Sequence, residues 1–242
     1  MSGAAVSAVL GLLRRLKRTD GLSLQHSSLS FLQVWAADHS PTTVLRMSIG
    51  ISEQIEDARN AINASQLSDE AKEGLLATLG GLGSAFSLGG MHTSIQSYIP
   101  ALDSAITNFA IVASMVDADL PASARAEIEE LAVEIEGLRA TIDDYGLEMP
   151  LREAVVRQLN ALIALLRNAD AVGVEPALAA YFELMWQLRK TKSADDEGKK
   201  SGLWSTVSAW SDRFTKVADL VDAGSKLLPV VEKAPDLLKF FG

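Results

Sequence analysis

Apolar residues along most of this 242-residue chain recur at alternating intervals of three and four positions. Residues spaced in this way share one face of an α-helix, so each run predicts an amphipathic helix. The clearest run follows Pro121 and consists of Ile128, Leu131, Ile135, Leu138, Ile142 and Tyr145. The same spacing predicts further helices near residues 6–16, 44–62, 69–79, 95–116, 151–169, 178–188 and 203–228.

Capping residues indicate where several of these helices begin and end. Ser40 before Pro41 favours a helix start, because serine caps free N–H groups and proline fits the first helical position. Ser68, followed by two acidic residues, indicates a second start. Gly80-Gly81 predicts the end of that helix, and Gly146 is a typical C-terminal stop.

The sequence leaves the secondary structure of two segments open. Pro100 lies inside the apolar run of residues 95–116, so that helix either begins near Pro100 or bends there. Residues 29–35 fit a short helix or a strand, because their apolar positions partly alternate.

These patterns predict an all-α fold, a multi-helix antiparallel bundle, because helices joined by short turns pack antiparallel. Four segments follow from the pattern: an amphipathic N-terminal helix and loop in residues 1–40, a bundle body in 41–190, a charged linker in 191–202 and a C-terminal amphipathic helix with an apolar end in 203–242. No repeat of matching residue types supports a solenoid.

The C-terminal segment carries one apolar stripe, interrupted in its register only at Gly224, that needs a covering surface. Trp204, Trp210 and Phe214 lie at helical spacing, and their positions suit either packing or an interface. Pro229 and Pro235 limit the helix, and the aromatic pair Phe240-Phe241 makes the segment's end apolar. The residues predicted to bind a partner are Trp204, Val207, Trp210, Phe214, Val217, Val221, Phe240 and Phe241.

Composition and charge narrow the function classes. Cysteine is absent, which excludes disulfides, thiol catalysis and Cys-ligated zinc or iron–sulfur clusters. The net charge is −9, and residues 117–150 hold ten acids against two arginines. Binding to phosphates requires clustered lysine and arginine, so we expect no nucleic-acid partner. A cytoplasmic location is expected.

No catalytic or metal-binding motif is present in the sequence. The three histidines lack a partner at metal-ligand spacing, and neither a serine-hydrolase elbow nor a phosphate-binding loop occurs. Glu127, Glu130 and Glu134 share a helix face away from the apolar stripe, which predicts a solvated acidic face or, alternatively, a surface for a basic partner. We therefore expect no enzyme activity and no cofactor.

The first hypothesis is a non-catalytic helical interaction protein that self-associates or binds a protein partner through its C-terminal amphipathic helix. The alternative is a conditionally membrane-acting effector, with peripheral membrane contact on activation. It would use the glycine-rich residues 74–102 and the basic amphipathic N-terminus. The N-terminal membrane-contact candidates are Val6, Leu10, Leu13, Arg14, Arg15, Lys17 and Arg18.

Overall fold

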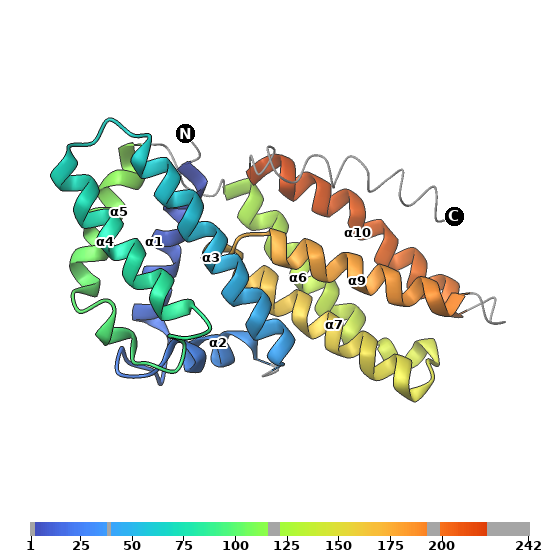
Figure 1. The fold of residues 1–242 in the computed structure, drawn as a ribbon. Helices are drawn as coiled ribbons and strands as arrows, with labels where there is room; N and C mark the ends of the chain where they lie inside the picture. The colour runs from blue at the N-terminus through green and yellow to red at the C-terminus, as the bar shows by residue number, and fades with distance from the viewer. Residues whose placement is uncertain (1–2, 38–39, 116–121, 193–198, 222–242) are drawn as a thin grey trace. The chain divides into compact units, whose positions relative to one another are not determined.

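The computed structural model describes residues 3–37, 40–115, 122–192 and 199–221, and these form an all-α protein (Figure 1). The described residues contain ten α-helices, two short 3-10 helices and no β-strand. The predicted all-α, multi-helix fold is confirmed, while the antiparallel arrangement stays a prediction.

The chain folds into two compact units. Unit 1 comprises Met1–Leu120 and Asn168–Pro176, and unit 2 comprises Pro121–Arg167 and Ala177–Gly242. These boundaries differ from the four segments predicted above. The N-terminal helix belongs to the same unit as the first part of the predicted body, and the C-terminal helix to the same unit as the second part.

Unit 1 is built around its first helix. It contains α1 (Gly3–Arg18), α2 (Ser28–Ala36), α3 (Pro41–Asn63), α4 (Asp69–Phe86), η1 (Ile95–Ser97), α5 (Leu102–Met115) and α8 (Ala169–Val172). Helix α1 packs against α3, α5 and α8. Its buried face includes Ala5, Ala8 and Leu12 beside the predicted stripe, so most of its apolar surface is enclosed.

Unit 2 contains α6 (Ala122–Ala140), η2 (Ile142–Tyr145), α7 (Met149–Arg167), most of α9 (Glu175–Lys192) and α10 (Lys199–Val221). Helix α6 packs against α7 and α10. Helix α9 contacts α7 through the Gln158–Glu183 hydrogen bond and α10 through stacking of Tyr181 on Phe214. Four helices therefore share one core (Figure 1).

Several predicted ends are confirmed. Ser40 is the N-cap of α3 with Pro41 in its first turn, and the Ser68 side chain accepts a hydrogen bond from the N–H of Ala71. Gly146 adopts a left-handed conformation with φ of 59°, but it ends the 3-10 helix η2, because α6 already ends at Ala140. Residues 29–35 are helical, since they lie within α2, and α5 begins after Pro100 without a bend.

The predicted helix end at Gly80-Gly81 is wrong. Helix α4 continues to Phe86, because Leu75, Leu79 and Leu82 are buried on one face and the burial outweighs the weak helix propensity of glycine. Gly81 also has a packing role, since a β-carbon there would collide with the carbonyl oxygen of Tyr98. The glycines permit a close approach within unit 1.

The neighbouring glycines of α4 give a matched pair of substitutions. Gly80→Ala is expected to stabilise unit 1 by about 0.5–1 kcal/mol, because alanine favours the helix and nothing lies within contact of the added methyl group. Gly81→Ala is expected to destabilise it by about 1–3 kcal/mol, because the methyl group meets the backbone. Urea unfolding followed by circular dichroism measures both. Equal effects of the two variants would contradict the described packing of α4.

Candidate functional site

The apolar stripe of α10 is buried within unit 2. The exposed fraction is 3% or less for the side chains at its five described stripe positions, which are Leu203, Val207, Trp210, Phe214 and Val217. Their three- and four-residue spacing places them on one helix face, and α6 and α9 supply the covering surface. The C-terminal helix therefore completes the core of its own unit.

Tyr181 of α9 fixes α10 at the middle of this stripe. Its ring stacks on Phe214 with 4.8 Å between centroids, and its hydroxyl donates a hydrogen bond of 3.2 Å to the carbonyl of Val207. Burial raises the pKa of Tyr181 well above its ordinary range, so the hydroxyl stays protonated and can donate. One side chain thus combines an aromatic contact with a specific backbone contact.

A second set of contacts joins α10 to α6 through charge. Arg213 binds three carboxylates of α6: its Nε lies 2.6 Å from Glu127, its Nη2 2.9 Å from Glu130 and its Nη1 2.9 Å from Glu134. Lys216 adds a contact of 2.5 Å to Glu127. We call Glu127, Glu130, Glu134, Arg213 and Lys216 the charge cluster. Carboxylates spaced three and four positions apart share one face of α6, so one guanidinium can reach all three.

The predicted solvated acidic face is wrong for Glu127, whose exposed fraction is 8%. The side chains of Glu130 and Glu134 keep 70% and 52% exposure, so the cluster is buried at one end and open at the other. The cations that face these acids in the structure, Arg213 and Lys216, belong to the same chain, and a basic partner for this face stays a prediction. Lys216 binds Glu127 across the two helices rather than Asp212 of its own helix.

Hydrogen bonds from Lys216 and Arg213 hold the pKa of Glu127 below its ordinary value of 4.5 and outweigh the opposite effect of burial. The folded state thus binds a proton to Glu127 less readily than the unfolded state does. The resulting stabilisation is complete above about pH 4.5 and is lost as the pH falls through the lowered pKa.

Because the pKa of Glu127 is lower in the folded state than in the unfolded state, unit 2 is expected to be less stable in acid. Between pH 7 and pH 3, the free energy of unfolding is expected to fall more for the wild-type chain than for Glu127→Gln. Glutamine is neutral, so acid has no carboxylate to protonate at this position. Urea unfolding at each pH measures the difference. An identical fall in both chains would show that Glu127 does not contribute to the acid response.

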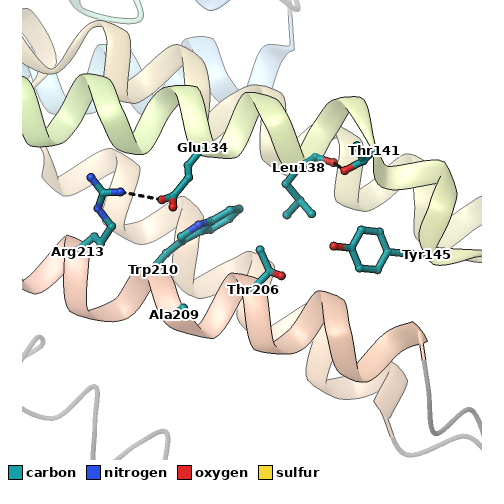
Figure 2. A pocket seen from close by; sticks show the side chains of 8 residues that line it. All are labelled: Glu134, Leu138, Thr141, Tyr145, Thr206, Ala209, Trp210 and Arg213. Atoms are coloured by element: carbon teal, nitrogen blue, oxygen red, sulfur yellow. Dashed lines mark hydrogen bonds and ion pairs between the residues drawn. The ribbon is translucent and has the colours of Figure 1, made fainter.

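A pocket of about 380 Å³ opens beside this cluster, between α6, η2 and α10. Figure 2 shows the Glu134–Arg213 pair at one end, the Trp210 indole and Leu138 along the wall, and the Tyr145 hydroxyl at the other end. Thr141 and Thr206 also line the pocket. The Thr141 hydroxyl donates to the carbonyl of Gly137 in α6, and the Thr206 hydroxyl donates to the carbonyl of Gly202 in its own helix. Neither hydroxyl is held against a general base.

The predicted partner-binding residues fall into three groups. Val207, Trp210, Phe214 and Val217 are buried in unit 2, so a partner reaches them only when α10 leaves its position. Trp204 is partly exposed. The side chain of Val221, together with Phe240 and Phe241, lies outside the described residues.

The predicted membrane-contact residues are also divided. Val6, Leu10 and Leu13 are buried in the core of unit 1, whereas Arg14, Lys17 and Arg18 are exposed. Lys17 pairs with Asp103 at 2.7 Å.

Arg15 is held more closely than its neighbours. It pairs with Asp170 at 3.4 Å and lies over the Trp35 ring, 5.6 Å from its centroid. In the folded unit, the basic end of α1 is therefore accessible and its apolar face is not.

Sequence reasoning missed the roles of Tyr181, Arg213 and Lys216. Arg213 and Lys216 flank the apolar stripe, which was a usable signal, because a charge at the edge of a buried stripe often faces an opposite charge on the next helix. Tyr181 gave no comparable signal. A single tyrosine in a helix does not reveal which backbone group it reaches.

Two other kinds of feature, a metal site and a membrane-spanning helix, were searched for in the described part of the chain. Among those residues, no group of three or more histidines and acids is arranged to hold a metal ion. None of the described helices is both long and apolar enough to cross a membrane. Comparison with protein-family models, curated proteins and solved structures finds no match for this chain.

Proposed function

We propose that this protein is a non-catalytic helical interaction protein whose C-terminal helix α10 binds a second copy of the chain or another protein. The observation that carries this proposal is the way α10 is held. A single amphipathic helix places its described apolar stripe and two cations, Arg213 and Lys216, against a surface made by α6 and α9. This is the helix-in-groove form of protein recognition, made in this case within one chain.

Exchange of α10 between chains would conserve every contact described above. Domain swapping is a low-cost route to association, because the same side chains meet in the closed and exchanged forms. The contacts that close unit 2 in one chain would join two chains when α10 is supplied by a neighbour. A different protein with a similar helix would use the same surface.

Energy transfer between two labelled copies tests this exchange. The chain has no cysteine, so Ser205→Cys on α10 and Glu129→Cys on α6 each give one exposed labelling site. Mixing donor-labelled and acceptor-labelled full chains is expected to give transfer that rises with concentration and time. A chain carrying both labels serves as the positive control. Transfer within that chain, but none between mixed chains at any concentration, would reject the self-association form of the proposal.

The alternative function, membrane action after a conformational trigger, is favoured by one observation on unit 1. An apolar helix is enclosed by other helices while Arg14 and Arg18 at its end remain exposed, so a membrane-active face would be hidden until the unit opens. Flotation and leakage with anionic liposomes, using the full chain and an Arg14→Glu/Arg18→Glu variant, test it. Both proteins are measured in buffer and in moderate urea that partly opens the unit. Absence of binding under both conditions, or equal binding of both proteins in urea, would remove this candidate.

A further inference from the structure

The surface that receives α10 belongs to α6 and α9. It contains a nearly buried carboxylate, that of Glu127. Glu127 is 8% exposed, and both of its carboxylate oxygens bind cations of α10: one accepts from Arg213 and the other from Lys216. A nearly buried carboxylate with no cation opposite it would be strongly unfavourable, because its lost hydration would not be replaced.

The apolar contacts fix the position of those cations. Trp210 lies three residues before Arg213, and Phe214 follows it directly. Phe214 is held by the Tyr181 ring, and Trp210 is 2% exposed. A helix shifted by one turn would fill the apolar surface but would carry its cation about 5.4 Å away from Glu127. The apolar stripe and the two cations together therefore allow only one position of the helix along the surface of α6 and α9.

We propose that unit 2 binds in trans an amphipathic helix of the same chemistry as α10, with two aromatic anchors four positions apart and an Arg/Lys pair three positions apart that faces Glu127. This inference rests on the proposed function and names its partner. Glu130 and Glu134 are more than half exposed, so they attract the arginine and leave Glu127 as the selective contact. Helices with neutral or acidic residues at these two positions are rejected, because Glu127 would be left without a cation.

The chain's own α10 competes with such a helix. A helix in the same chain acts at a high effective concentration, so a free helix binds the wild-type chain weakly. Weakening the tethered helix removes this competition. The apparent affinity for a helix in trans then rises in proportion to the open fraction of unit 2.

Fluorescence anisotropy with two labelled peptides tests the selectivity. The first peptide has the sequence of residues 199–221, and the second carries glutamate at the positions of Arg213 and Lys216. Both are measured against the full wild-type chain and against a full chain with Arg213→Glu/Lys216→Glu. The native peptide is expected to bind this variant at least ten-fold more tightly than it binds the wild-type chain. It is also expected to bind the variant at least ten-fold more tightly than the acidic peptide does.

The outcomes separate the two proposals. If both peptides bind the variant equally, exchange of α10 stands and the charge selectivity is wrong. If neither peptide binds, both proposals fail. Circular dichroism checks that the variant is folded. If the variant is not folded, the two peptides are compared on the wild-type chain at higher protein concentrations. The native peptide must bind at least ten-fold more tightly than the acidic peptide there as well.

Discussion

Replacing Phe214 with alanine is expected to lower the free energy of unfolding of unit 2 by about 3–5 kcal/mol. The ring is 3% exposed and stacks on Tyr181 at 4.8 Å, so its removal leaves a cavity at the contact between α9 and α10. Urea unfolding followed by circular dichroism measures the change. The matched control is Ser205→Ala on the exposed side of the same helix, expected within about 0.5 kcal/mol of wild type.

A loss below about 1 kcal/mol for Phe214→Ala would contradict the described packing, because removal of a well-buried phenylalanine side chain costs more than that. Such a result would mean that α10 is not part of the folded core of unit 2. It would also remove the basis for treating the receiving surface as a selective site.

Reversing the charge of Arg213 is the second large change. Arg213→Glu is expected to destabilise unit 2 by about 3 kcal/mol, the lower end of the range for breaking a buried ion pair, because the Arg213 side chain is 25% exposed. The variant places a fourth carboxylate beside Glu127, Glu130 and Glu134. Unfolding in urea at low and moderate salt measures the loss, which is expected to shrink with salt as repulsion between the exposed carboxylates is screened.

Arg157→Glu on the exposed side of α7 is the matched control for this reversal. It changes the net charge of the chain by the same amount and is expected to cost about 0.5 kcal/mol or less. Equal losses in the two variants would show that net charge, and not the charge cluster, accounts for the effect.

The sequence predicted the helices and their buried faces well, because periodic apolar residues report directly on burial. The stripe residues Val207, Trp210, Phe214 and Val217 are all buried. The error at Gly80-Gly81 arose because glycine was weighed by its local propensity, whereas the tertiary contact of Gly81 with Tyr98 requires a residue without a side chain.

The site itself was less predictable. The acidic row on α6 and the basic residues beside the stripe of α10 were both visible as patterns. Their pairing joins positions 86 residues apart, Glu127 and Arg213, and depends on how the helices pack. Helical periodicity describes one helix at a time, so it could not state which face of α6 would meet α10. For the same reason it could not predict that α3, α5 and α8 enclose the apolar face of α1.

Mixing two self-repelling variants tests most directly whether α10 can act between chains. One full chain carries Arg213→Glu/Lys216→Glu, and the other carries Glu127→Lys/Glu130→Lys/Glu134→Lys, so each has like charges on its own α6 and α10. In an exchanged pair, both interfaces regain opposite charges. Light scattering is expected to show a 1:1 heterodimer in the mixture and none with either variant alone. If the mixture contains no heterodimer at any concentration while both variants are folded, α10 does not bind in trans.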